Sequence, residues 1–412
     1  MKKYRFHLVT LAHLPQSKEY MSCAFTQKNL KMAKMLTSLG HEVFFYGSEG
    51  SDVLDYCKGQ PGIIHYIETH KLVDIAADYG DGDNRFEIGY DWKNSDFRHD
   101  FNEIHKPSTN KFKENTIKHI NKVKKPDDFL LLSQGSYQQE IRSEVGLYLN
   151  CEFGIGYRGA MESNFRAFES AYIQNFTYGS EHPRACINGS FYDRVIPNYF
   201  EPEDFEVGLN PKDYFLFIGR MIKRKGIITA AETCKALGKK LIIVGQGAKV
   251  HENGHLIPNE DPDFDLAPGT WEYLGYADVA KRKELMSNAI ATFTPTEYLE
   301  CFAGTHVESR LSGTPVITTN FAVFGGTVEN GLDGYRCDTL DDFVWAAKNI
   351  GKLDRALVRK RAERYLMENV RWDFQKWFDD LYDVYLSSVS DKPIGWHNIR
   401  ESEPEWRNKI KW

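Results

Sequence analysis

The sequence predicts an α/β protein with two Rossmann-like halves, and three observations lead to this prediction. Strand–helix–strand patterns recur in both halves of the chain, and a segment with two prolines, residues 195–202, separates the two series. The length of 412 residues exceeds one ordinary domain, and 42% hydrophobic with 27% charged residues is a globular composition. We therefore expect an N-terminal domain over residues 1–197 and a C-terminal domain over residues 198–372. A C-terminal helix, at about residues 373–412, should join the first domain.

The first half opens with one complete strand–helix–strand unit. Residues 4–11 form a buried apolar run, which predicts a strand. The apolar residues that follow at helical spacing are Phe25, Leu30, Ala33, Leu36 and Leu39. Gly40 indicates the end of this helix, and residues 41–46 predict a second strand. Such units build parallel sheets.

The rest of the first half is less regular. Residues 78–101 are polar and aromatic with several glycines, which favours a loop. A helix should run from Pro107 to Pro126, and residues 129–132 predict another buried strand.

The second half repeats the pattern from residue 214. A helix is expected at about residues 226–237. The predicted strands are residues 214–218, 241–244, 271–274, 290–293 and 315–318. Near the end of the chain, apolar residues again recur at helical spacing, which predicts a helix packed on a domain. These residues are Trp377, Phe378, Leu381, Tyr382 and Tyr385.

Composition excludes several classes of protein. Fifty-two Lys and Arg against 58 Asp and Glu give a net charge of −6, which disfavours broad capture of nucleic acid. No apolar run approaches the ~20 residues of a membrane helix, so we expect no transmembrane segment, and we find no export signal. The seven cysteines form no CxxC pair, which indicates reduced thiols in a cytoplasmic protein and no zinc site.

The first candidate site is a basic turn, residues 219–226, between a predicted strand and helix. It contains four cations, which are Arg220, Lys223, Arg224 and Lys225. Ligands of open α/β sheets bind beyond the carboxyl ends of strands, and a cationic turn before a helix suits a diphosphate. The alternative is a solvated basic turn.

The second candidate site contains two glutamates, Glu300 and Glu308. Eight residues of helix turn through about 800°, so these carboxylates would lie near one face, with Glu308 in a helix and Glu300 just before it. Backbone amides of residues 301–303 would be free to bind an oxyanion or a sugar hydroxyl. The alternative is a solvated helix face.

The motifs of the second half, in their order along the chain, resemble those of glycosyltransferase family 4, whose members have the GT-B fold. The resemblance covers about residues 195–345 and is thinner in the first half. The matching segments are Gly219-Arg220, Lys225-Gly226, Val244-Gly245-Gln246-Gly247, Leu274-Gly275, Pro295-Thr296, Glu300-Cys301-Phe302-Ala303, Glu308, Gly313-Thr314-Pro315-Val316 and Gly325-Gly326-Thr327-Val328-Glu329.

The resemblance implies a retaining, nucleotide-sugar-dependent glycosyltransferase whose two domains face each other across a cleft. The C-terminal domain would bind the nucleotide sugar and the N-terminal domain an acceptor that the sequence does not identify. The implied catalytic residues are Arg220 and Lys225, on the donor diphosphate, and Glu300, on the transferred sugar. The implied donor-binding residues are Glu308 on the ribose, the amides of Phe302 and Ala303, and Gly219, Gly245 and Gly304. No metal or other cofactor is expected, because Arg and Lys take the role that a metal has in other transferases.

On the acceptor side, the sequence departs from the family pattern. The first loop, which contains His13, lacks the family's glycine pair, and residues 154–162 lack the family's histidine. Arg158 or Glu162 would take its place, and His13 is a third candidate.

Several other motifs have structural explanations. Asp81-Gly82-Asp83 and Asp261-Pro262-Asp263 imitate a metal motif but are ordinary loop pairs, and His182 is expected in a loop. Lysines 111, 118, 122 and 125 indicate a solvated helix, or else contact with a membrane surface or a nucleic acid.

Three other functions remain open at this point. They are a sugar-nucleotide epimerase or a glycosyl phosphorylase of the same fold, a non-catalytic sugar-nucleotide-binding protein, and a transferase that modifies a nucleobase in DNA.

Overall fold

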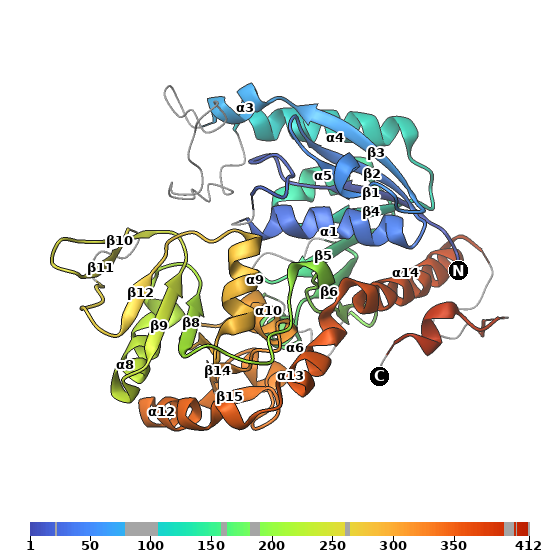
Figure 1. Ribbon diagram of the computed structural model, residues 1–412. Coiled ribbons are helices and arrows are strands. Elements are labelled where there is room, and N and C mark those ends of the chain that lie inside the picture. Colours follow the sequence, from blue (N-terminus) through green and yellow to red (C-terminus); the bar gives the residue numbers. More distant parts are fainter. Residues whose placement is uncertain are drawn as a thin grey trace. The chain divides into compact units, whose positions relative to one another are not determined.

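A computed structural model describes residues 1–20, 23–78, 106–157, 163–181, 190–259, 264–390, 399–400 and 402–410 (Figure 1). The chain divides into two compact units. Unit 1 contains the described residues up to Pro197 and from Glu368 onwards, and unit 2 is Asn198–Met367. The boundaries expected from the sequence lay after residues 197 and 372. None of the described helices has the length and apolar character needed to cross a membrane.

Unit 1 is built on one parallel sheet. Within the described residues the strand order is β3-β2-β1-β4-β5-β6-β7, and all neighbours pair in parallel. The strands are β1 (Arg5–Val9), β2 (Glu42–Ser48), β3 (Ile63–His70), β4 (Phe129–Leu132), β5 (Asn150–Ile155), β6 (Phe165–Phe168) and β7 (Arg194–Val195). The helices are α1 (Ala24–Ser38), α2 (Val53–Tyr56), α3 (Leu72–Ala77), α4 (Pro107–Val123), α5 (Gln139–Val145), α6 (Ala171–Glu181) and α14 (Met367–Val389). The order 3-2-1-4-5-6 is that of the Rossmann fold.

Helices cover both faces of this sheet, and Figure 1 shows α4 and α1 on opposite sides. Successive residues of a strand point to opposite faces. Leu130 therefore packs with Phe112 of α4. Its neighbour Phe129, together with Phe6, contacts Phe378 of α14, with ring centroids 5.3 and 4.8 Å from the Phe378 centroid.

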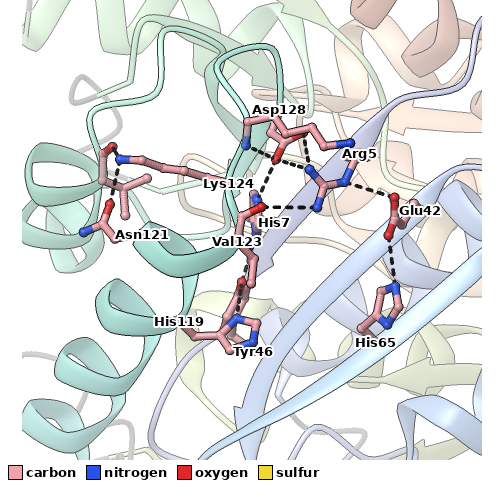
Figure 2. Close-up of polar contacts among 12 residues, drawn as sticks. Arg5, His7, Glu42, Tyr46, His65, His119, Asn121, Val123, Lys124 and Asp128 are labelled. Carbon is pink, nitrogen blue, oxygen red and sulfur yellow. Dashed lines mark hydrogen bonds and ion pairs between the residues drawn. The ribbon is translucent and has the colours of Figure 1, made fainter.

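A polar network lies toward the amino ends of β1, β2 and β4 (Figure 2). The buried ring of His7 contacts Asp128 through Nε2 at 3.1 Å and Tyr46 Oη through Nδ1 at 2.9 Å. Arg5 donates to Asp128 at 2.9 Å and to Glu42 at 3.0 Å. The buried Asp128 carboxylate therefore has both a guanidinium and an imidazole as partners, as a buried charge requires.

Unit 2 repeats the arrangement. Within the described residues its larger sheet has the order β12-β9-β8-β13-β14-β15, again with parallel neighbours, which is the same 3-2-1-4-5-6 order. The strands are β8 (Tyr214–Ile218), β9 (Lys240–Val244), β12 (Trp271–Tyr273), β13 (Thr292–Thr294), β14 (Val316–Thr319) and β15 (Gly334–Cys337), with a separate antiparallel pair, β10 (Ala248–Val250) and β11 (Leu256–Pro258). The helices are α8 (Ile227–Leu237), α9 (Val279–Asn288), α10 (Gly304–Leu311), α11 (Phe324–Thr327), α12 (Leu340–Asn349) and α13 (Arg355–Ala362).

Two hydrophobic clusters hold the helices of unit 2 on its sheet. Phe215 packs with Ile227 of α8 and Phe343 of α12 on one face. Leu216, the next residue of β8, packs with Leu285 of α9 on the other face. Both faces of β8 are thus buried, as expected for a central strand of a parallel sheet.

The predicted α/β fold with two Rossmann-like sheets is confirmed. The expected strands at residues 4–11, 41–46 and 129–132 form β1, β2 and β4, and the five expected strands of the second half form β8, β9, β12, β13 and β14. No strand was expected from the sequence at β3, β5, β6, β7, β10, β11 or β15. Apart from Asp78, the loop expected at residues 78–101 lies outside the described residues.

Candidate active site

Two loops leave the same edge of the sheet in unit 2. β8 leads into the basic turn, and β13 leads into residues 295–303, which we call the β13 loop. The two strands are parallel neighbours, with Phe293 opposite Phe217. The strand order reverses between them, and ligands of open α/β sheets bind beyond the carboxyl ends of the strands at such a point.

Gly226 brings the basic turn into contact with the β13 loop. Its φ is 77°, and a Cβ there would lie 1.9 Å from the carbonyl oxygen of Pro295. The amide of Glu297 also donates to the carbonyl of Arg224 at 2.9 Å. Because the two backbones touch, the side chain of Lys225 lies close to the β13 loop.

Lys225 and Glu300 form an ion pair. Lys225 Nζ lies 2.7 Å from Glu300 Oε2, and Tyr298 Oη donates to the same oxygen at 2.7 Å. The side chains of Lys225 and Glu300 are 24% and 13% exposed. Glu300 Oε1 accepts no hydrogen bond from the described residues. Two donors therefore orient this carboxylate while one oxygen stays available to a ligand hydroxyl.

Cations surround the ring of Tyr298. The Arg224 guanidinium and the Lys225 ammonium lie 5.1 and 5.0 Å from the ring centroid. Burial and the negative charge of Glu300 raise the pKa of Tyr298, while Arg224 and Arg220 oppose the rise. The phenol therefore stays a neutral donor, and Arg220 and Arg224 expose positive charge at the carboxyl edge.

Gly245, directly after β9, lies against the start of the basic turn. A Cβ at this position would lie 1.8 Å from the carbonyl oxygen of Gly219. The Gly245 amide donates to Gly275 at 2.9 Å, and its carbonyl accepts from Tyr273 Oη at 2.7 Å. A side chain here would displace the turn or this peptide, so the position requires glycine.

The first turn of α10 presents free backbone amides. Ala303, the N-cap residue, has φ 60° and ψ 64°, a left-handed conformation that costs a non-glycine residue ~1–2 kcal/mol. The amides of residues 302–305 have no acceptor among the described residues. The side chain of Phe302, by contrast, is buried at 3% exposure and stacks on Phe200. Only the backbone of Phe302 is therefore available to a ligand, beside the small Gly304.

Glu308 of α10 forms an ion pair with Arg282 of α9. The pair joins Arg282 Nη2 to Glu308 Oε2, and the two side chains are 24% and 18% exposed. Because Arg282 occupies Oε2, only Oε1 of Glu308 remains available to accept from a bound molecule.

The acceptor-side candidates are only partly described. His13 lies in the loop after β1, is 8% exposed, and places Nε2 3.4 Å from Cys23 Sγ. Arg158 and Glu162 lie outside the described residues, as do Asp81-Gly82-Asp83, Asp261-Pro262-Asp263 and His182.

Four lysines in or just after α4 were singled out from the sequence. Lys111, Lys118, Lys122 and Lys125 are all exposed, and Lys111 pairs with Asp74 at 2.6 Å.

Sequence reasoning missed Tyr298 and Arg282. Tyr298 could have been found, because it lies two residues before Glu300 in a loop expected at the site. Arg282 carries no local signal, since only the packing of α9 beside α10 brings it to Glu308.

Comparisons with known sequences give one family-model match, which lies almost wholly in unit 2, and two curated relatives. Residues 200–371 match the family model described as "Glycosyl transferases group 1". The glycogen synthase of Mycobacterium tuberculosis is 27% identical over 164 residues, which cover 39% of this chain and 38% of the relative. The capsular polysaccharide biosynthesis glycosyltransferase CapM of Staphylococcus aureus is 23% identical over 223 residues, which cover 50% of this chain and 55% of CapM. The chain thus matches only 38% and 55% of the length of these relatives.

Comparisons with solved structures extend over both units. The sucrose-phosphate synthase of Thermosynechococcus elongatus has a TM-score of 0.61 at 14% identity, covering 94% of this chain and 100% of that chain. Alr3699/HepE of Anabaena, in complex with UDP and glucose, has a TM-score of 0.56 at 11% identity with the same coverage. AviGT4, a glycosyltransferase involved in avilamycin A biosynthesis, has a TM-score of 0.54 at 15% identity, covering 92% and 98%. These likenesses show the GT-B fold.

Proposed function

We propose that this chain, whose second unit matches the family model of group 1 glycosyl transferases, transfers a sugar from a nucleoside-diphosphate sugar to an acceptor hydroxyl with retention of configuration. The observation that carries the proposal is the Lys225–Glu300 pair at 2.7 Å, at the carboxyl edge between β8 and β13. In this pair Lys225 would be the cation that binds the diphosphate and Glu300 the carboxylate that binds the sugar. A donor that binds there would have its breaking bond between the two groups.

Positive charge supports the leaving group. As the bond from the anomeric carbon to the diphosphate breaks, negative charge grows on the phosphate oxygen. Arg220 and Lys225, fixed by the basic turn, would stabilise that charge more in the transition state than in the ground state. These two cations would do this without a metal ion. The acceptor oxygen would attack from the same face, and its proton would pass to the leaving phosphate.

The remaining groups would hold the two ends of the donor. Glu300 Oε1 and the amides of residues 302–304 would bind the transferred sugar. Glu308 Oε1 would accept from the ribose hydroxyls, with Arg282 holding the carboxylate in place through Oε2. Gly219 and Gly245 would let the diphosphate approach the backbone closely.

We further propose a uridine nucleotide, because Alr3699/HepE was solved with UDP and glucose. Unit 1 would contribute the acceptor site, with His13, Arg158 and Glu162 as its candidate residues. The six described cysteines are free thiols, which fits a reducing compartment such as the cytoplasm.

Donor turnover tests the proposal. A panel of nucleotide sugars is screened by thermal shift, because a bound donor stabilises the fold, and the best donor is assayed. Arg220→Ala and Lys225→Ala should each reduce its turnover by about tenfold or more at unchanged melting temperature. Lys239→Ala is the matched control, because Lys239 pairs with Asp213 on the exposed surface at 2.6 Å. Normal turnover in both test variants would refute the assigned roles, and loss of activity in EDTA would refute metal independence.

Product analysis separates the alternatives. An epimerase releases an altered donor without an acceptor, and a phosphorylase needs inorganic phosphate. A purified protein that binds the donor and neither hydrolyses nor transfers it would be a binding protein.

A further inference from the structure

Two donors of one residue hold the carbonyl of Ala303. The His306 amide donates to this oxygen at 3.1 Å, and Nδ1 of the His306 ring contacts the same oxygen. In a planar trans peptide the C=O of one residue and the N–H of the next point in opposite directions. Fixing the Ala303 carbonyl therefore also fixes the direction of the free amide of Gly304.

The His306 ring is itself rigidly placed. It is fully buried and meets the rings of Phe302 and Phe324 edge-on, at centroid distances of 6.0 and 5.5 Å. Burial and the charge of Arg310 hold the pKa of His306 well below its usual range. The ring is thus neutral, and its single proton lies on Nδ1, facing the Ala303 carbonyl. Nε2 has no partner among the described residues.

Ala303 needs such support. Its φ of 60° is unfavourable for any residue with a Cβ, and strained residues persist only where their surroundings hold them. Its methyl group packs against a cluster that includes Val316, Val323 and Phe324. That contact favours alanine over glycine, but it does not orient the peptide, whereas the His306 hydrogen bonds do.

We propose that His306 is a positioning residue for donor binding. It keeps the left-handed turn at Ala303 and thereby aims the Gly304 amide at the transferred sugar. The inference rests on the proposed function, because it takes the amides of residues 302–304 to bind the transferred sugar.

Three substitutions test the inference in the full chain. His306→Phe keeps a ring and removes the Nδ1 donor, so the KM for the nucleotide sugar should rise about tenfold with a smaller change in kcat. His306→Asn places an amide donor near the position of Nδ1 and should restore most of the affinity. In the A303G background, H306F should have less effect, because glycine adopts a positive φ without the Cβ penalty.

A second readout does not need activity. Hydrogen exchange at Gly304 and the unfolding midpoint in urea are measured for H306F, A303G and the double variant. If His306 holds the turn, the two changes are non-additive, and exchange at Gly304 is faster in H306F than in H306N. Additive changes, an H306N variant as impaired as H306F, or an unchanged KM in H306F would each overturn the inference. If H306F does not fold, H306N and the double variant give the comparison. A wild-type protein that turns over no nucleotide sugar would instead refute the proposed function. The urea and exchange measurements would still show whether His306 holds the turn, so the two failures can be told apart.

Discussion

The network around Asp128 in unit 1 and the turn at Ala303 in unit 2 both contain several polar groups, but only the network provides all of them with hydrogen-bond partners among the described residues. Asp128 is 1% exposed and has Arg5 and His7 as partners, with distances of 2.9 and 3.1 Å (Figure 2). At Ala303 the backbone is strained, and the amides of residues 302–305 have no acceptor among the described residues.

The difference separates a stabilising site from a binding site. A polar group that already has its partners contributes to folding and offers little to a ligand. Strain and unsatisfied groups lower stability, and a fold retains them where a bound molecule completes them. Substitutions around Asp128 should therefore change the free energy of unfolding, whereas substitutions around Ala303 should change the binding of the donor.

The largest effect on stability is expected at Asp128. Asp128→Ala removes a buried carboxylate and leaves Arg5 and His7 without it, so the free energy of unfolding should fall by about 3–5 kcal/mol. Donor affinity of the folded variant should be unchanged. Urea unfolding and calorimetric donor titration measure the two quantities. Asp213→Ala, which breaks the exposed pair with Lys239, is the control and should cost at most ~0.5 kcal/mol. A D128A variant that is as stable as the wild type but binds the donor more weakly would contradict the assignment of Asp128 to a stabilising site.

A second effect concerns acid. Tyr4 N donates to Nδ1 of the buried His41 at 3.2 Å, and the other ring nitrogen lies 2.9 Å from Gln375 Oε1. Burial lowers the pKa of His41 to about 4. Between about pH 6.5 and pH 4, His41 binds a proton in the unfolded chain but not in the folded chain. The free energy of unfolding therefore falls as the pH is lowered through this range.

The loss attributable to His41 should reach up to ~3 kcal/mol at pH 4. Other histidines with lowered pKa values act in the same direction, namely His70, His119 and His306. The unfolding free energy is therefore compared between the wild type and His41→Gln from pH 7 to pH 4, and the variant should show the shallower slope. Parallel curves would show that His41 is not the acid-sensitive group.

The fold was predictable where the sequence repeats a simple pattern. β8 is a short apolar run, β13 follows the apolar residues Ile290 and Ala291, and both strands precede motifs of fixed spacing, so their place and the loops after them could be deduced. β5 was missed because Asn150, Glu152 and Gly154 interrupt its apolar pattern. The burial of Glu152 depends on a partner elsewhere in the chain, because the Gly135 amide donates to its carboxylate at 2.7 Å.

The site divides in the same way. The expectation that Lys225 and Glu300 belong to one site followed from the resemblance that the ordered motifs carry. No sequence motif indicated the ion pair of Arg282 with Glu308 or the hydrogen bonds of His306 to the Ala303 carbonyl, because both depend on the packing of α10 with its neighbours. The roles of the site residues in donor binding stay predictions.

The last prediction compares substitutions of two glycines at the two ends of one helix, and one of them is expected to have the smallest effect on stability. Gly226 and Gly238 flank α8, with φ values of 77° and 60°. A Cβ at Gly226 would lie 1.9 Å from the Pro295 carbonyl oxygen, whereas a Cβ at Gly238 would meet nothing within 4 Å. Gly238→Ala should therefore cost only the backbone penalty of ~1 kcal/mol.

Gly226→Ala adds a backbone clash and should cost about 2 kcal/mol more. Because the clash separates the basic turn from the β13 loop, it should also reduce donor turnover by at least about tenfold, while G238A leaves turnover unchanged. Urea unfolding and donor assays of the two variants give this difference directly. Equal losses of turnover would mean that α8 as a whole, and not the contact at Gly226, keeps Lys225 beside Glu300.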